Sequence, residues 1–159
     1  LLRDGGLLTA ATSSQMCDGA SAVLVANEAG LKALAARPLA RVRPMSVMGG
    51  DPVIMLETPI AATEKALRRA GMTMSDIDLY EVNEAFASIP IAWLEATGAD
   101  IDRLNVNGGA IALGHPLGAS GAKLMATLVH AMQARDVSVG LQTMCEGGGL
   151  ANVTILERA

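Results

Sequence analysis

The sequence predicts a layered α/β domain in which helices cover a mixed sheet of five strands. Short apolar runs of strand length alternate with segments of roughly a dozen residues that have helical character. Hydrophobic residues make up 51% of the chain but only three are aromatic, so small aliphatic side chains must build a core suited to helix-on-sheet packing. The last two apolar runs are joined by a few residues, which favours an antiparallel hairpin and hence a mixed sheet.

Five segments have the length and composition of strands. The first is a continuous apolar run, as in a buried strand, and the second alternates basic or small residues with Val and Met, as in a half-buried one. In chain order the expected strands are 20–26, 41–48, 77–82, 137–144 and 150–156.

Four helices are expected, and each has a start or stop signal. In order they are a helix capped by Asn27 that reaches about Ala36, a helix from Thr58 to Ala70, a helix that begins at Asn83-Glu84, and 120–134. Gly71 is expected to end the second helix. Pro90 is expected to kink or end the third, because proline lacks a backbone donor.

Composition restricts the classes of protein to which the chain can belong. Its 159 residues fit one domain, and a net charge of −4 argues against nucleic acid or an anionic membrane as a partner. No apolar run reaches the roughly 18 residues that span a bilayer. Two distant cysteines form no disulfide framework, so a reducing, cytoplasmic setting is expected. The chain begins at Leu1 rather than Met, so we expect a fragment of a longer polypeptide.

His115 lies in a loop with five glycines, and Pro116 disfavours helical backbone at the histidine. The next helix is expected to begin near 118–120, and the positive end of its dipole favours the neutral imidazole that a general base needs. A core histidine bonded to a backbone carbonyl is the alternative, but the surrounding glycines favour a functional site. A phosphate-binding loop is a second alternative, although no Walker lysine or GxGxxG pattern is present.

Cys145 precedes a turn that contains three successive glycines, 147–149. A buried free cysteine is usually a small hydrophobe, but three glycines cost entropy and contribute no packing. Their bare N–H groups could instead donate to a developing oxyanion. A thiol whose pKa is modestly lowered from about 8.5 could exchange a proton with a carbon acid near neutral pH.

Asn83 lies where a strand is expected to enter a helix. An ordinary N-cap is the simpler interpretation, and an amide donor aimed at a ligand or at a fixed water is the alternative. His130 and Cys17 have no supporting group of residues, and we expect both to be structural.

Taken together, three motifs resemble the C-terminal half of a thiolase. They are Asn83-Glu84-Ala85-Phe86, Gly114-His115-Pro116-Leu117-Gly118-Ala119-Ser120-Gly121 and Cys145-Glu146-Gly147-Gly148-Gly149. The lead-in from Thr9 to Ala20 also resembles the segment that enters that half. The resemblance implies that 1–16 end a preceding region and that 17–159 form the C-terminal domain of a fold that pairs two α/β halves.

Thiolases exchange an acyl group between coenzyme A thioesters, by cleaving a 3-ketoacyl-CoA or by condensing two acyl-CoAs. The resemblance implies that His115 activates a nucleophilic cysteine and that Cys145 takes or returns the proton at the α-carbon. It also implies that Asn83 fixes a water in one oxyanion hole and that the N–H of Gly147 contributes to the other.

Binding residues and partners are implied in the same way. Ser14 matches a position that contacts the pantetheine arm, and Ala85 and Phe86 match positions that line the acyl pocket. Coenzyme A or acyl-CoA is the expected substrate, with no permanently bound cofactor and no metal site. The resemblance further implies an N-terminal partner half and a homodimer or homotetramer of the full-length protein.

The family's acyl-carrying nucleophile is another cysteine, which lies in the N-terminal half. Neither Cys17 nor Cys145 stands in that context, so the chain alone should lack turnover. The motif Cys145-Glu146-Gly147-Gly148-Gly149 favours the degradative branch, as in fatty acid β-oxidation. Three competing hypotheses remain: a non-catalytic acyl-CoA binding module, a half that serves assembly, and a decarboxylating condensing enzyme.

Overall fold

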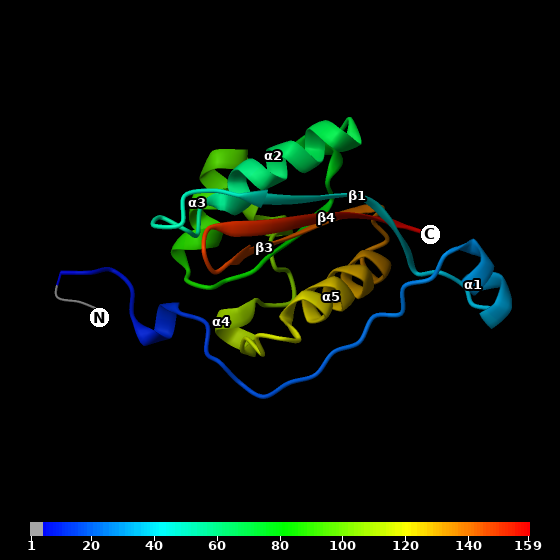
Figure 1. Cartoon of the computed structure of the whole chain (residues 1–159), viewed down its shortest axis with the longest axis horizontal. Coiled ribbons are helices and arrows are strands. Elements are labelled where there is room, and N and C mark those ends of the chain that lie inside the picture. The colour runs from blue at the N-terminus through cyan, green and yellow to red at the C-terminus, as the bar shows by residue number, and fades with distance from the viewer. Residues whose placement is uncertain (1–4) are drawn as a thin grey trace.

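A computed structural model describes residues 5–159 as a four-stranded sheet with helices on both faces (Figure 1). Within that range the strands are β1 (Ala40–Gly49), β2 (Leu79–Val82), β3 (Val139–Glu146) and β4 (Leu150–Arg158). The α-helices are α1 (Glu28–Leu34), α2 (Thr58–Ala70), α3 (Ser88–Thr97), α4 (Ala110–Leu113) and α5 (Ser120–Ala134), and single 3₁₀ turns occur at Ala10–Thr12, Met74–Asp76 and Ile101–Arg103. Residues 1–4, which belong to the expected preceding region 1–16, lie outside the described residues.

The strands follow the order β1-β4-β3-β2, with β2 parallel to β3 and the other pairs antiparallel. The predicted mixed sheet and its closing hairpin are therefore confirmed. The prediction of five strands is wrong, because 20–26 is extended but pairs with no strand within 5–159. Its apolar side chains face solvent, and Leu24 is 78% exposed. A strand needs a neighbour for its backbone groups, and this segment has none here.

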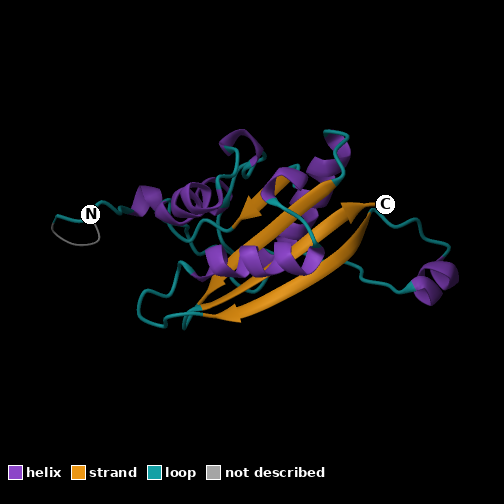
Figure 2. Ribbon diagram, turned by 90° about the horizontal axis from the view of Figure 1, so that it is seen from above, coloured by secondary structure: helices purple, strands orange, loops and turns teal. Residues whose placement is uncertain are grey.

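The two faces of the sheet are covered by different helices (Figures 1 and 2). Helices α2 and α3 pack on one face, where Trp93 stacks at a tilt on Tyr80 with ring centroids 5.4 Å apart. Trp93 Nε1 also donates to Thr63 Oγ1 at 2.9 Å, so its one polar atom is satisfied. Helix α5 covers the other face through Leu128 and Met132. The α1 helix lies apart from the sheet.

Local signals set most helix boundaries as expected. Asn27 caps α1 by accepting from Gly30 N, Gly71 ends α2 in the left-handed conformation, and α5 occupies 120–134. The third helix begins at Ser88 rather than at 83–84, because the backbone of 85–87 pairs with the lead-in instead. Pro90 therefore lies in its first turn, where a missing N–H costs nothing. Within 5–159, no helix is both long and apolar enough to cross a bilayer.

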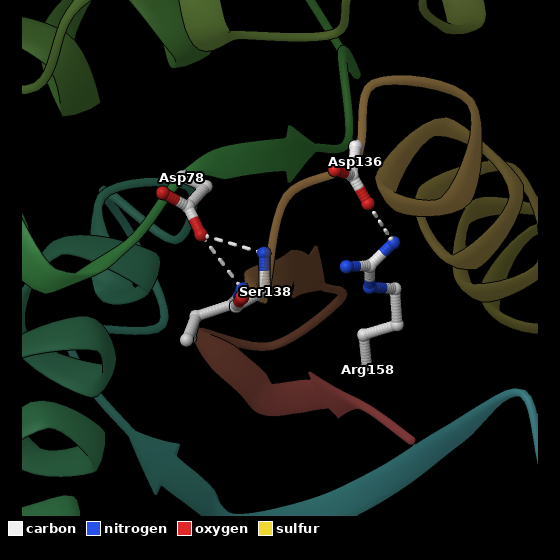
Figure 3. A network of polar contacts seen from close by, with 5 residues as sticks. Asp78, Asp136, Ser138 and Arg158 are labelled. Carbon is white, nitrogen blue, oxygen red and sulfur yellow. Dashed lines mark hydrogen bonds and ion pairs between the residues drawn. The ribbon is translucent and has the colours of Figure 1, made fainter.

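Polar contacts hold the starts of the parallel strands β2 and β3 together (Figure 3). Asp78, just before β2, accepts from the backbone N–H of Ser138 at 2.9 Å and of Val139 at 2.8 Å. Arg158 at the end of β4 pairs with Asp136 at 2.6 Å. Because parallel strands place their carboxyl ends at one edge, this anchoring brings the ends of β2 and β3 to the same edge.

Candidate active site

The lead-in segment 12–16 runs between the loop after β2 and the loop before α5. Ser14 donates to the carbonyl of Ala85 through its backbone N at 3.1 Å and its Oγ at 3.3 Å. Ser13 forms a bridge with Phe86, and His115 N donates to Gln15 O at 2.8 Å. The structure therefore brings Ser14, Ala85, Phe86 and His115, which the sequence marks in three separate motifs, to one place.

His115 is half-buried, and its ring is held by the first residue of α5. Its Nδ1 lies 2.6 Å from Ser120 Oγ, and that hydroxyl lies 3.0 Å from Pro116 O. A serine has one hydroxyl proton, so donation to Pro116 leaves the oxygen to accept from Nδ1–H and leaves the lone pair on Nε2. Burial, together with the Lys123 charge, lowers the pKa of His115 from 6.5, so the ring is a neutral base at pH 7.

Cys145 lies near the end of β3 and is 8% exposed. Burial raises the pKa of its thiol from 9.0, and the neighbouring Glu146 charge acts in the same direction. The expectation of a modestly lowered thiol pKa is therefore wrong, because burial disfavours the thiolate. A protonated thiol at neutral pH is suited to giving a proton to a carbanion rather than to attacking a carbonyl carbon.

The three glycines after Glu146 have different structural roles. A Cβ added at Gly149 would lie 2.8 Å from Asp51 O, so the third glycine permits close packing of two loops. Its carbonyl accepts from Gly50 N at 2.7 Å and Thr58 Oγ1 at 2.9 Å. Gly147 is exposed, and a Cβ there would meet nothing within 4 Å. The first glycine therefore borders open space, as a backbone donor for a ligand must.

Asn83 lies directly after β2, at the edge of the sheet where β3 also ends. Its backbone N donates to Thr143 O at 3.0 Å, which extends the pairing of β2 with β3 and places Asn83 beside the end of β3 that carries Cys145. It is not an N-cap, because α3 begins only at Ser88. Asn83 and Ser120 also border one small cavity. No hydrogen bond joins His115 to Cys145 within 5–159. Asn83 bonds to the strand that carries Cys145 and shares a cavity with Ser120, which holds His115.

Sequence reasoning missed several residues that support this arrangement. Asn105 pairs its side-chain amide with both backbone groups of Val82 at 2.9 Å and donates to Glu84 at 3.0 Å. Glu84 in turn accepts from Ile111 N at 3.0 Å, at the start of α4. A Cβ at Gly109 would collide with the Glu84 carboxylate, so only glycine leaves room for that side chain here. Glu81 was also missed, although strand alternation places it on the same face as Asn83.

His130 is exposed on α5. Cys17 is also exposed, but its Sγ lies against Gly114, where an added Cβ would be 2.5 Å away, so Cys17 packs on the loop that carries His115, in line with the structural role expected for it. Among residues 5–159, no cluster of three or more His, Cys, Asp or Glu side chains could hold a metal ion.

The fold and this set of residues define a thiolase-type domain, and comparisons with known proteins agree. The family model described as "Thiolase, C-terminal domain" matches residues 36–158, and the chain belongs to that family. It is 55% identical to a steroid 3-ketoacyl-CoA thiolase of Mycobacterium tuberculosis over 99% of its own length and 39% of the relative's. The chain thus spans about two fifths of the curated relatives it matches.

Solved structures show the same likeness. An acetyl-CoA acetyltransferase of Bacillus anthracis superposes with a TM-score of 0.95 at 35% identity, over 99% of this chain and 40% of that one. Human mitochondrial 3-ketoacyl-CoA thiolase in complex with CoA superposes with a TM-score of 0.91 at 39% identity, over all of this chain and 40% of that one. The thiolase-like α/β fold is therefore confirmed.

Proposed function

We propose that this chain supplies the acid/base half of a thiolase active site, which transfers acyl groups between coenzyme A thioesters. The observation that carries the proposal is the arrangement around Asn83. Asn83 bonds to the strand that carries the buried, protonated thiol of Cys145, and it shares a cavity with Ser120, which holds the neutral imidazole of His115 with Nε2 free. The match to thiolases over nearly the whole chain supports the same conclusion. The names of the relatives favour cleavage of 3-ketoacyl-CoA.

In the cleavage direction the roles follow from these protonation states. His115 Nε2 accepts the proton of a nucleophilic thiol, which attacks the 3-keto carbon; the bond between C2 and C3 then breaks and leaves an enolate on the thioester. Cys145 gives its proton to C2. The incoming coenzyme A thiol returns a proton to Cys145 and takes the acyl group, and His115 reprotonates the freed thiolate. Asn83, through a water that it fixes, and the N–H of Gly147 donate toward the oxygens that gain charge.

The nucleophilic thiol comes from an N-terminal thiolase half, because the raised pKa of Cys145 makes it a poor nucleophile. The surface of this chain supports such a partner. The unpaired segment 20–26 and the loop after β1 expose apolar side chains, with Val53 88% exposed. Beside that loop, Ile54 and Trp93 border an apolar cavity of about 240 Å³. We expect the other half to cover these surfaces. Assembly into two or four copies stays a prediction.

Ser14 is the proposed contact for the pantetheine arm, and Ala85 and Phe86 are the proposed lining of the acyl pocket. Their support is that the lead-in pairs with the loop that carries them, next to His115. Coenzyme A thioesters are the proposed substrates, and the CoA-bound human relative supports this choice.

The test uses the joined enzyme, by which we mean this chain fused to the part of the M. tuberculosis relative that it does not cover. We expect thiolysis of acetoacetyl-CoA by the joined enzyme and none by this chain alone. Cys145→Ala and His115→Ala should each lower kcat by about 10²-fold or more. His130→Ala is the matched control and should change kcat by less than about twofold, since His130 is exposed on α5. Full activity of Cys145→Ala would contradict the proton-transfer role.

A further inference from the structure

A buried carboxyl group, Glu81, lies behind the proposed site. Glu81 belongs to β2 and precedes Asn83 by two residues, so both side chains leave the same face of the strand. It is 1% exposed, and neither carboxyl oxygen has a hydrogen-bond partner within residues 5–159. Burying an unpaired carboxyl group is costly, so this position needs a physical explanation.

Glu81 and Asn83 border one small cavity, and Ser120 and Lys123 of α5 close it from the other side. The space open to the centre of a water molecule is about 10 Å³, which is close to what a single water needs. Polar side chains from the strand and from the helix surround that space, as a bound water requires. The Oδ1 atom of Asn83 is itself buried without a partner within 5–159.

The carboxyl group is neutral at pH 7. Burial raises the pKa of Glu81 to about 8, and the negative charge of Glu84 adds to the effect. Lys123 faces the same cavity and opposes the shift, but its ammonium group also donates to Gly114 O at 3.0 Å. A protonated carboxyl group can donate a hydrogen bond, whereas an ionised one can only accept.

This difference decides which end of the Asn83 amide points inward. A protonated Glu81 can donate to Oδ1 through the water, which leaves the amide N–H groups free to donate on the open side. An ionised Glu81 would attract those N–H groups into the cavity instead. The Nδ2 atom of Asn83 makes no hydrogen bond within 5–159 and, unlike Oδ1, is not fully enclosed.

We infer that Glu81, acting with one water molecule in this cavity, is a positioning residue that keeps the amide N–H of Asn83 turned toward the oxyanion hole. The inference rests on the proposed thiolase function, because it assigns Asn83 the task of oxyanion donor. Ser120 borders the same cavity and holds the ring of His115, so the proposed water also lies beside the residue that orients the base.

Two substitutions in the joined enzyme separate positioning from packing. Glu81→Gln is neutral and nearly isosteric and keeps a donor, so kcat at pH 7 should stay within about twofold of wild type. Glu81→Leu keeps the volume but has no donor, so kcat should fall about tenfold or more while KM changes little. Circular dichroism and thermal melting establish that both variants fold. An unchanged kcat in a folded Glu81→Leu, or an equal loss in Glu81→Gln, would overturn the inference.

The pH profile gives a second arm that needs only the conservative variant. Wild-type kcat should decline as pH rises through about 8, where Glu81 ionises, and Glu81→Gln should lack that decline. Cys145 cannot produce it, because burial raises the pKa of that thiol above 9.0. Identical alkaline limbs in wild type and Glu81→Gln would overturn the assignment.

Infrared spectroscopy gives a third arm that is independent of turnover. Wild type at pH 7 should show the carbonyl band of a protonated carboxylic acid that Glu81→Gln lacks, and the band should vanish above about pH 8. Absence of that band at pH 7 overturns the inference even if the joined enzyme is inactive. An inactive wild type would refute the proposed function, whereas an active wild type that is insensitive at Glu81 would refute the inference alone.

Discussion

Asn105 gives a prediction that can be worked through from the structure. Its side chain accepts from Val82 N and donates to Val82 O, both at 2.9 Å, and donates to the Glu84 carboxylate at 3.0 Å. The side-chain amide therefore satisfies both backbone groups of the last residue of β2, just before Asn83. Its own backbone has a φ of 44°, in the left-handed region.

The expected cost of Asn105→Ala follows from these contacts. Each neutral hydrogen bond to Val82 contributes about 1 kcal/mol, and a bond to a charged carboxylate contributes about 1.5–3 kcal/mol. Loss of all three predicts a destabilisation of roughly 3–5 kcal/mol. Asn105→Gly should cost about 1 kcal/mol less than Asn105→Ala, since glycine adopts the left-handed conformation without strain.

The assay is urea unfolding of the joined enzyme, monitored by circular dichroism, with Asn107→Ala as the matched control. Asn107 is two residues along the same loop and exposed, so its substitution should change the unfolding free energy by less than about 0.5 kcal/mol. A difference of less than about 1 kcal/mol between Asn105→Ala and Asn107→Ala would show that these hydrogen bonds do not stabilise the fold as stated.

The pKa of Glu81 is raised from 4.5 to about 8 in the folded state. Between these pH values the folded state keeps a proton that the unfolded state loses, so the free energy of unfolding should fall as pH rises, by at most about 5 kcal/mol in total. Glu81→Gln should not show this fall. A parallel pH dependence in both proteins would contradict this. Iodoacetamide should alkylate exposed Cys17 before buried Cys145. Because burial raises the pKa of the Cys145 thiol above 9.0, its alkylation rate should still be increasing with pH at pH 9. Mass spectrometry of digests measures both rates, and faster reaction at Cys145 would disagree. Trp93→Phe should lower the free energy of unfolding by about 1–3 kcal/mol, because it leaves the buried Thr63 hydroxyl unpaired. Adding Thr63→Val should restore part of that loss. Strictly additive effects of the two substitutions would argue against the hydrogen bond.

Elements with local signals were predictable from the sequence. Helix α5 begins and ends where its apolar spacing indicates, and Gly71 ends α2 because it adopts the left-handed conformation there. The hairpin of β3 and β4 followed from the short glycine-rich joint between two apolar runs. In each case the determining residues lie within a few positions of the feature that they set.

Features that depend on distant partners were not predictable in this way. The segment 20–26 has strand composition but no neighbouring strand within the described residues. The start of α3 was misplaced because 85–87 bond to the lead-in some seventy positions away. The predicted shift of the Cys145 thiol pKa had the wrong direction, because burial, which the sequence does not show, outweighs any local effect.

The proposed site is tested most directly by a crystal structure of the joined enzyme with coenzyme A bound. The coenzyme A sulfur should lie in a cleft between His115 Nε2 and Cys145 Sγ, with the Asn83 amide beside it. A coenzyme A thiol bound far from both side chains, or a wall of protein between His115 and Cys145, would contradict this arrangement.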